Sequence, residues 1–502
     1  MRGIPARLAV CVLAAALLTA AALRLVGGRV DTPTADEALI ELKTLNAVAL
    51  AEASGPYSRF GWSHPGPMMF YAQAPIYVLG RRQPASLFAG AVLINLLFIA
   101  LALHAAGRMG RWSSLLGAAA VCLVAWRAPG VLASSWNPHL LLFPWLALIA
   151  CGGAWVDRGG AGMLAAVVWC ASWLVQTHIG AGPCVFLFIA TMAALRRPKL
   201  PARSAAALLA FGVLLWTPML LDVVRHGSES NPRQIAGWFA HDTRGHLGWR
   251  DALKAAGESL TAFVRPQPLA VPVGWAWRTS GRTAQSWAIG SGVLLVALLA
   301  ARRMGAAAAL TASVFAGAVY TAWSVRGEMV DHLLFWLGGG LPALVVIAAG
   351  AQGDLAQRFK TFSAAVRGLA LALCAALAMQ QLAAQPVRTS SEVSLATSAL
   401  IAQAGRSLDR AVVDLDDGCW GEAAGIVARL RNANYGIRVP QSLGFMFGRA
   451  TVAADVSGLL RVAIRRDETV SGRRMLASHG APQIVAGGLQ IWLIGPGAGP
   501  TP

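Results

Sequence analysis

The sequence predicts an α-helical, polytopic membrane protein that ends in a small α/β domain. Of its 502 residues, 56% are hydrophobic and only 13% are charged, whereas a soluble domain carries about 25% charged residues. The apolar residues fall in long runs, and about 20 such residues cross the hydrocarbon core of a bilayer as a helix. From about residue 383 onward these runs disappear and a soluble pattern replaces them.

About eleven apolar segments are expected to span the membrane as helices. They are Leu8–Leu25, Ala85–Ala106, Ser113–Leu132, His139–Val156, Gly162–Gln176, Gly180–Leu195, Ser204–Leu221, Ala284–Ala301, Gly305–Trp323, Val330–Gly350 and Phe362–Leu382. The first of them looks like a secretory signal, but the apolar core of a signal is only about 7–15 residues long. We therefore expect an uncleaved first span, with a cleaved signal as the alternative.

Arginine and lysine residues indicate the orientation, because they accumulate in short cytoplasmic loops. If the amino terminus is cytoplasmic, every inner loop is short and basic. These loops contain Arg108 and Arg111, Arg158, Arg196 and Arg197, Arg302 and Arg303, and Arg358 and Lys360. An odd number of spans then places the carboxyl-terminal segment outside. Topology and lipid headgroups thus explain the net charge of +19 better than nucleic-acid binding does. The Ala-, Arg- and Gly-rich composition favours a bacterial inner (plasma) membrane.

Two domains follow from this topology. Residues 1–382 form the membrane domain, with outer loops 26–84 and 222–285, and residues 383–502 form an exoplasmic α/β domain. The elements expected in the second domain are a helix over Ser391–Arg410, a strand over Ala411–Asp416, a helix over Gly421–Asn432 and strands over Tyr435–Val439 and Leu489–Ile494. Such alternation of strands and helices is typical of a small α/β fold.

The first outer loop carries two adjacent carboxylates, Asp36 and Glu37, at the start of a predicted helix. Apolar residues follow with helical spacing at Ala38, Leu39, Leu42, Leu45 and Ala49. This amphipathic pattern predicts a helix that lies in the membrane interface. Thr34 and Glu37 have the spacing of a capping box, which would make Glu37 structural. Asp36 has no such role and is the better candidate for chemistry.

The same loop contains a histidine at a rigid bend. His64 precedes Pro65 and Pro67, which restrict the backbone and cannot lie inside a continuous helix. Met68–Leu79 then resumes as an apolar helix. The bend is expected to direct His64 toward the helix that carries Asp36, and an ordinary interfacial histidine is the alternative.

These features resemble the GT-C glycosyltransferases. The shared pattern is an Asp-Glu pair shortly after the first span, an amphipathic helix, a glycine turn, a basic residue before proline and an aromatic helix. It is similar to the branch of protein O-mannosyltransferases and lipid A aminoarabinose transferases, which has Lys/His-Pro-Pro where this chain has His64-Pro65-Gly66-Pro67. The motifs cover about the first 110 residues, and the general architecture extends the resemblance beyond them.

The resemblance implies a transferase that moves a hexosyl or pentosyl group from a polyprenyl-phosphate donor to an exoplasmic acceptor in the cell envelope, which is a glycan, a lipid or a protein. Asp36 would orient or deprotonate the acceptor hydroxyl, with Glu37 as the second catalytic candidate. The departing phosphate requires positive charge. The candidates for that charge are Arg59, His64, Arg225 and Arg233, and contact with lipid headgroups is the alternative for each. No cofactor is expected. A divalent metal stays open, although the histidines and aspartates show no tight ligand spacing.

Further polar residues fall at the ends of spans that face the same side as Asp36. They are Asn137, His139, Gln176, His178 and His332. Polar side chains in such positions are expected to line a shared cavity. The alternative is that each histidine is a simple interfacial residue.

Two rival functions remain open at this stage. A secondary transporter would require charged residues at the membrane midplane and broken helices in related halves, but the sequence shows no internal repeat. A non-catalytic protein of cell-envelope assembly would keep the same spans as an enzyme. Consumption of a polyprenyl-phosphate sugar distinguishes the transferase from both.

Overall fold

The computed structural model describes residues 6–27, 32–197, 199–264, 290, 304–351, 360–384, 390–416, 418–466 and 469–496. The chain divides into two compact units. The first comprises residues 1–18, 64–68 and 91–384, and the second comprises residues 19–63, 69–90 and 385–502. The second unit thus joins most of the first loop (residues 26–84) to the carboxyl-terminal part of the chain.

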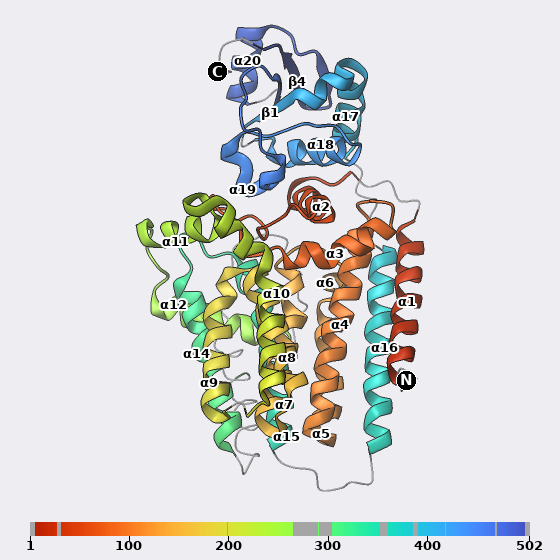
Figure 1. Ribbon diagram of the computed structural model, residues 1–502, viewed down its shortest axis with the longest axis vertical. Helices are drawn as coiled ribbons and strands as arrows, with labels where there is room; N and C mark the ends of the chain where they lie inside the picture. Colours follow the sequence, from red (N-terminus) through yellow and green to blue (C-terminus); the bar gives the residue numbers. More distant parts are fainter. Residues whose placement is uncertain are drawn as a thin grey trace. The chain divides into compact units, whose positions relative to one another are not determined.

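The first unit is a bundle of helices (Figure 1). Its longer helices are α5 (Arg111–Arg127), α7 (Leu142–Arg158), α8 (Ala161–Thr177), α9 (Gly182–Leu195), α10 (Ala202–His226), α11 (Asn231–His241), α12 (Trp249–Leu260), α14 (Met304–Ser324), α15 (Gly340–Ala351) and α16 (Lys360–Ala384), with most of α4 (Ser86–Met109). Helix α7 packs against α8 and α15, α5 packs against α15 and α16, and α9 packs against α14. Short helical turns connect them, namely α6 (Pro129–Leu132), η1 (His139–Leu141), η2 (Ile179–Ala181), η3 (Gly227–Glu229), η4 (Asp331–Leu333) and η5 (Phe335–Gly339).

The expected spans agree with helices over most of the described residues. Five helices there are long and apolar enough to cross a membrane, and shorter apolar helices cover the regions of other expected spans. Two expected spans are interrupted. The segment Ser113–Leu132 breaks after Arg127, because Pro129 starts the separate helix α6. The segment Val330–Gly350 becomes α-helical only from Gly340. The expected span Ala284–Ala301 lies outside the described residues, so the number of eleven stays a prediction.

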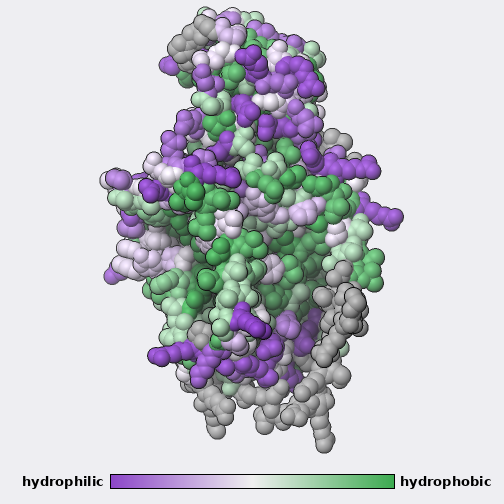
Figure 2. Space-filling model, viewed as in Figure 1, coloured by the Kyte–Doolittle hydropathy of each residue, from purple (hydrophilic) through white to green (hydrophobic). Residues whose placement is uncertain are grey.

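The helical unit presents a hydrophobic surface (Figure 2). On α10 the side chains of Leu209, Val213 and Leu214 are exposed, and few residues of this helix are buried by the rest of the protein. An apolar helix that the protein itself leaves uncovered is expected to face lipid.

The carboxyl-terminal part of the second unit contains a four-stranded sheet in the order β1-β2-β4-β3 (Figure 1). The strands are β1 (Ala411–Leu415), β2 (Leu460–Arg466), β3 (Ile484–Ala486) and β4 (Leu489–Ile494), and the helices are α17 (Ser391–Ala404), α18 (Trp420–Asn432), α19 (Gly444–Phe447) and α20 (Val470–His479), with the turns η7 (Gly405–Arg410), η8 (Gln441–Leu443) and η9 (Arg449–Thr451). Strands β1 and β2 are parallel, and the other pairs are antiparallel.

Four of the five elements expected in this region are confirmed, as α17 with η7, β1, α18 and β4. The strand expected over Tyr435–Val439 is wrong. Only isolated bridges form there, at Arg438 and Val439, because a left-handed turn at Asn434 precedes the segment and Pro440 follows it, where the missing N–H prevents further pairing.

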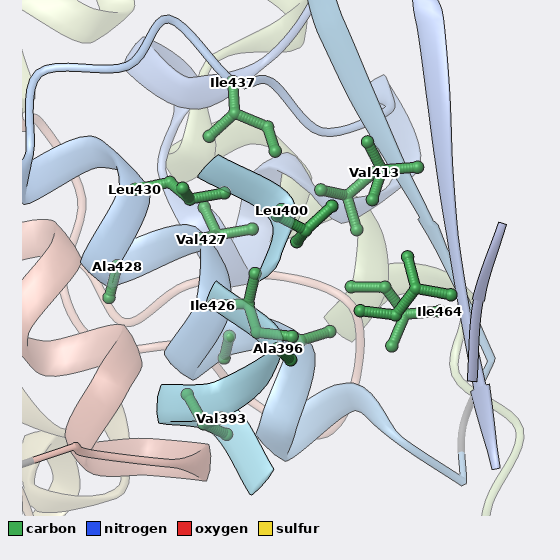
Figure 3. Packing of buried hydrophobic residues seen from close by; sticks show 14 of the residues in the cluster. Val393, Ala396, Leu400, Val413, Ile426, Val427, Ala428, Leu430, Ile437 and Ile464 are labelled. Atoms are coloured by element: carbon green, nitrogen blue, oxygen red, sulfur yellow. The ribbon is translucent and has the colours of Figure 1, made fainter. Parts of the chain in front are cut away.

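The core of this region lies between the sheet and two helices (Figure 3). Val413 of β1 and Ile464 of β2 are buried together with Leu400 of α17 and Ile426 and Val427 of α18. Apolar burial of this extent is the main force that holds the strands and helices together.

Candidate active site

The two candidate carboxylates lie in the first turn of helix α2 (Ala35–Val48). Both Asp36 and Glu37 are half-buried. Thr34 occupies the N-cap position, but its side chain makes no capping hydrogen bond, so the Thr34 half of the expected capping box is wrong. Ala35, the first residue of α2, adopts a positive φ of 51°. Such a backbone conformation is uncommon outside glycine.

The apolar side of α2 packs against protein, which corrects the expectation that it lies in the membrane interface. Ala38, Leu39 and Leu42 belong to the same buried core as α18. Helix α18 approaches closely because it carries glycine there: a Cβ atom on Gly425 would overlap the carbonyl oxygen of Pro33. An apolar stripe looks the same in sequence whether lipid or another helix covers it.

Asp36 is held by Tyr57, which lies in the turn after α2. The Tyr57 hydroxyl donates a hydrogen bond of 2.6 Å to Oδ1 of Asp36. The Tyr57 ring meets the Trp420 ring edge-on, with the centroids 6.0 Å apart. Burial, and then the Asp36 carboxylate, raise the pKa of Tyr57 well above its ordinary value of 10.0. The phenol therefore stays protonated, and it keeps donating to Asp36.

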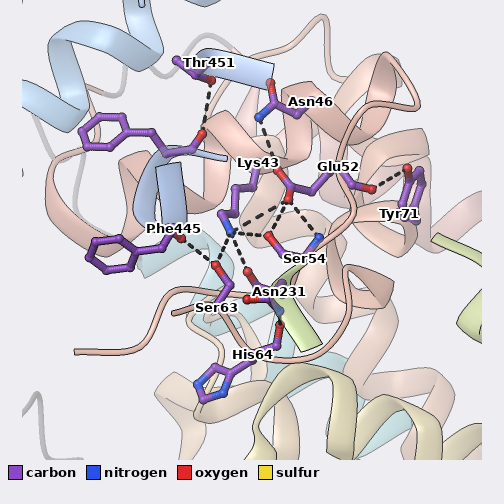
Figure 4. Close-up of polar contacts among 12 residues, drawn as sticks. Lys43, Asn46, Glu52, Ser54, Ser63, His64, Tyr71, Asn231, Phe445 and Thr451 are labelled. Carbon is purple, nitrogen blue, oxygen red and sulfur yellow. Dashed lines mark hydrogen bonds and ion pairs between the residues drawn. The ribbon is translucent and has the colours of Figure 1, made fainter. Parts of the chain in front are cut away.

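Lys43 of α2 is buried with its charge, only 1% exposed (Figure 4). Its ammonium donates hydrogen bonds to the carbonyl oxygen of Gly55 at 2.6 Å, to Ser54 Oγ at 3.1 Å and to Ser63 Oγ at 3.2 Å. The Glu52 carboxylate lies 3.9 Å away. A buried charge is tolerated only when it is paired and hydrogen-bonded in this way. Burial lowers the pKa of Lys43, and the charge of Glu52 opposes that effect.

The same network reaches the carboxyl-terminal part of the chain. The Ser63 hydroxyl donates a hydrogen bond of 2.6 Å to the carbonyl oxygen of Phe445, and Asn46 Nδ2 donates to Glu52 at 3.3 Å. Figure 4 shows these contacts around the Lys43 ammonium. The first loop is therefore tied at Ser63 just before the chain enters the bend at His64.

Glu41 is a second buried charge of α2, also 1% exposed. It accepts a hydrogen bond of 2.8 Å from the Tyr77 hydroxyl and one of 3.4 Å from Asn432 Nδ2. Neither Glu41 nor Lys43 is expected from the sequence to be buried, because charged residues on a helix with an apolar stripe normally face water. No local pattern marks these two charges as buried, because their partners, such as Tyr77 and Gly55, lie outside α2.

The bend at His64 belongs to the helical unit, where two elements hold it. His64 Nδ1 accepts a hydrogen bond of 3.3 Å from the backbone N–H of Ile179, so a neutral imidazole carries its hydrogen on Nε2. The carbonyl oxygen of His64 accepts a hydrogen bond of 3.1 Å from Asn231 Nδ2. In the sequence, His64 is a candidate for the positive charge that the phosphate requires. This geometry instead suits a neutral N–H donor.

Gly66 explains the departure of this bend from the Lys/His-Pro-Pro pattern. Its N–H donates a hydrogen bond of 3.2 Å to the carbonyl oxygen of Gln176, and a Cβ atom at this position would overlap the Gln176 side chain. Gln176 is itself fixed, because Nε2 donates to the carbonyl oxygen of Leu215 at 2.8 Å. A side chain at position 66 would therefore have to displace the Gln176 side chain where the bend lies against the end of α8.

The expected cavity residues are partly brought together. The rings of His64 and His178 lie 4.6 Å apart. Trp136 lies between His139 and His332, with centroids 5.0 and 5.2 Å from theirs. His139 is further fixed by Ser134, whose Oγ lies 2.8 Å from Nδ1.

The remaining predicted residues have less definite surroundings. Asn137 is half-buried in the turn before η1, and Gln176 is fully buried beneath Gly66. Arg225 and Arg233 are exposed on α10 and α11, and among the described contacts neither arginine bonds to His64. Arg59 is exposed and lies over the ring of Phe60, 4.9 Å from its centroid.

Metal binding was left open by the sequence. In the part of the chain that the structure describes, no three His, Cys, Asp or Glu side chains are placed to hold a metal ion together. Metal independence stays a prediction.

The comparisons with known proteins concern the fold. No protein-family model and no curated protein matches the sequence. Among solved structures, the chain is similar to ArnT from Cupriavidus metallidurans bound to undecaprenyl phosphate, with 14% identity, a TM-score of 0.55 and coverage of 95% of this chain and 97% of that one. It is also similar to the same protein in the apo state, with 14% identity, a TM-score of 0.53 and coverage of 97% and 98%.

The similarity therefore extends over both units and over nearly the whole of ArnT. ArnT is a lipid A aminoarabinose transferase of the GT-C superfamily, and it lies in the branch to which the motifs around Asp36 and His64 pointed. The chain has the fold of the ArnT transferases.

Proposed function

We propose that the protein is an integral membrane glycosyltransferase that moves a sugar from a polyprenyl phosphate to an acceptor of the cell envelope. The observation that carries the proposal is the ArnT-like fold over 95% of the chain, in which the first loop presents Asp36 under the control of Tyr57. ArnT itself has been crystallised with undecaprenyl phosphate, and a polyprenyl phosphate of this kind is the donor lipid that we propose here.

The chemistry is a displacement at the anomeric carbon of the donor. The acceptor hydroxyl attacks this carbon, its proton passes to the Asp36 carboxylate, and the bond between the anomeric carbon and the phosphate oxygen breaks. The electron pair leaves with the lipid phosphate. A correctly placed general base contributes about 10²–10⁴-fold to such a step. Glu37, in the same turn of α2, is the second candidate for the base.

The departing phosphate is stabilised by hydrogen-bond donors and positive charge. His64 is proposed to donate from Nε2, because its Nδ1 already accepts the N–H of Ile179. Arg59, Arg225 and Arg233 are proposed to contact the phosphate or neighbouring lipid headgroups. The side chains of Asn137, His139, Gln176, His178 and His332 are proposed to line the space for the sugar.

The orientation belongs to the same proposal. The protein is proposed to lie in a bacterial inner membrane with its amino terminus in the cytoplasm and the first loop, the second loop (residues 222–285) and the carboxyl-terminal domain outside. A reporter enzyme that is active only outside the cytoplasm, fused to the carboxyl terminus, is expected to be active, and a silent fusion of equal abundance would contradict this orientation.

The function is tested with purified protein and labelled polyprenyl-phosphate sugars. The protein is expected to release polyprenyl phosphate when an envelope extract supplies the acceptor, and Asp36→Asn is expected to lower the rate by about 10²–10⁴-fold. Glu37→Gln is the matched control and is expected to have the smaller effect. Full activity of a folded Asp36→Asn protein would overturn the role of Asp36. Solute uptake into proteoliposomes without donor turnover would favour a transporter.

A further inference from the structure

A buried carboxylate fixes the beginning of the second loop. Asp222 lies near the end of α10 and is only 2% exposed. Its Oδ2 accepts a hydrogen bond of 2.7 Å from the backbone N–H of Asn231, and its Oδ1 lies 2.8 Å from His226 Nδ1. Each carboxylate oxygen thus has a definite partner, and the two partners lie on either side of the turn that joins α10 to α11.

This arrangement determines where α11 starts. Asn231 is the first residue of α11, and the first N–H groups of a helix have no partner inside the helix. A carboxylate placed there satisfies one of them and is favoured by the helix dipole. Gly227, with a φ of 51°, lets the chain turn between α10 and α11 without the strain that a side chain would bring.

Asn231, which Asp222 holds in place, also contacts the bend of the first loop. Its side chain is buried, and Nδ2 donates to the carbonyl oxygen of His64 at 3.1 Å. His64 precedes Pro65, so its backbone has few allowed conformations. A hydrogen bond that fixes its carbonyl oxygen therefore also limits the directions that the imidazole can take.

The ring of His64 is held by a separate element. Its Nδ1 accepts the N–H of Ile179, the first residue of η2. The backbone and the ring of His64 are thus held by two different parts of the bundle. Together, these two hydrogen bonds determine the direction in which Nε2 points. A misplacement of about 1 Å can cost about 10²-fold in rate.

We propose that Asn231, held in place by Asp222, is a positioning residue that orients His64 toward the departing lipid phosphate. The inference rests on the proposed function and adds to it that the second loop, through the side-chain amide of Asn231, sets the geometry of the first. Asn231 touches neither donor nor acceptor in this account. Its effect passes through His64 alone.

The test compares Asn231→Ala with Asn95→Ala in the donor-consumption assay. Asn95 of α4 is the matched control, because it is also buried and donates to two backbone carbonyl oxygens, those of Val131 and Leu132. Asn231→Ala is expected to lower kcat by about 10-fold or more while KM for the donor changes by less than about three-fold, the sign of an interaction that matters in the transition state. Asn95→Ala is expected to keep kcat per folded protein.

The decisive measurement is the double variant Asn231→Ala/His64→Ala. If Asn231 acts through His64, this protein has the same kcat as His64→Ala alone, because two residues of one unit are not additive. Multiplied losses would overturn the inference. Asn231→Asp is a second variant of equal size that replaces the donor by an acceptor, and it is expected to lose as much activity as Asn231→Ala.

The outcomes separate the two proposals. A wild-type protein that consumes donor together with a fully active Asn231→Ala variant would overturn the inference and leave the function intact. A wild-type protein that consumes no polyprenyl-phosphate sugar with any acceptor extract would overturn the function, and the inference with it.

Discussion

Tyr57 donates a hydrogen bond of 2.6 Å to Asp36 across 21 positions of the chain. The bond closes the first loop on itself, because Asp36 starts α2 and Tyr57 lies in the turn beyond its end. A general base acts only when its carboxylate points at the proton that it removes. The partner that sets this direction is therefore expected to influence the rate of transfer more than the binding of substrates.

Replacement of Tyr57 by phenylalanine tests this expectation. Tyr57→Phe keeps the ring against Trp420 but removes the donor to Asp36. A hydrogen bond to a charged group contributes about 1.5–3 kcal/mol, so kcat is expected to fall by about 10–100-fold with little change in KM. Tyr435→Phe is the control, because Tyr435 lies in the same unit with its ring near Arg406. Equal kcat for the two variants would contradict the positioning role.

The raised pKa of Tyr57 predicts a dependence of stability on pH. The folded protein holds this proton more tightly than the unfolded chain, so the stability that it contributes is present below about pH 10 and is lost as the pH rises further. Between about pH 9.5 and 11, Tm is expected to fall more steeply in the wild type than in Tyr57→Phe. Thermal unfolding in detergent measures both slopes, with Tyr435→Phe expected to follow the wild type. Parallel slopes for the wild type and Tyr57→Phe would contradict the prediction.

The buried ammonium of Lys43 predicts a large loss of stability on its removal. Lys43→Met leaves the Glu52 carboxylate buried without its cation, and breaking a buried pair in this way costs about 3–5 kcal/mol. The exposed Lys199 supplies the control, since Lys199→Met is expected to change stability by less than about 0.5 kcal/mol. The double variant Lys43→Met/Glu52→Gln is expected to recover part of the loss, because it no longer buries a lone charge. Equal unfolding temperatures for Lys43→Met and Lys199→Met would show that the pair contributes nothing.

Much of the fold follows from the sequence because a bilayer imposes a length on each helix. Strand β2 was missed for an equally physical reason. It contains Arg461, Arg465 and Arg466, which suggest a solvated segment, yet Arg465 is only 4% exposed and pairs with Asp414 at 3.0 Å. A charge that is neutralised by a distant partner has the same appearance in sequence as one that faces water.

The candidate site divides in the same way. Asp36 and His64 were predicted because adjacent carboxylates and a proline-flanked histidine form a local pattern. The residues that support them were not predicted, because these contacts join distant positions in the chain. Asn231 is 167 residues from His64. Ser63 is 382 residues from Phe445. Only the fold brings such pairs together, and no spacing in the sequence reports them.

Gly66 supplies a prediction about the bend. Gly66→Ala places a methyl group where the Gln176 side chain already lies, and such overpacking costs about 1–3 kcal/mol. Gly212→Ala in α10 is the matched control, because a Cβ atom there meets no neighbour within 4 Å. It is expected to be neutral or stabilising by up to about 1 kcal/mol. Shortening the partner in Gly66→Ala/Gln176→Ala is expected to relieve the clash, and a double variant no more stable than Gly66→Ala would contradict the proposed contact.

The contact between Trp420 and Tyr57 predicts that the carboxyl-terminal part of the chain influences the proposed role of Asp36 as the base. Its ring supports Tyr57 from helix α18, and its loss frees the phenol to turn away from Asp36. Trp420→Ala is therefore expected to lower kcat toward the value of Tyr57→Phe. Trp420→Phe keeps an edge-on ring contact, which is worth about 0.5–1.5 kcal/mol, and is expected to retain most of the rate.

Trp126→Ala is the control for loss of a tryptophan, because that side chain is 66% exposed on α5. If Trp420 acts only through Tyr57, the variant Trp420→Ala/Tyr57→Phe has the kcat of Tyr57→Phe alone. A further loss in the double variant, at equal amounts of folded protein, would show that Trp420 contributes to transfer by a route that does not pass through the hydrogen bond to Asp36.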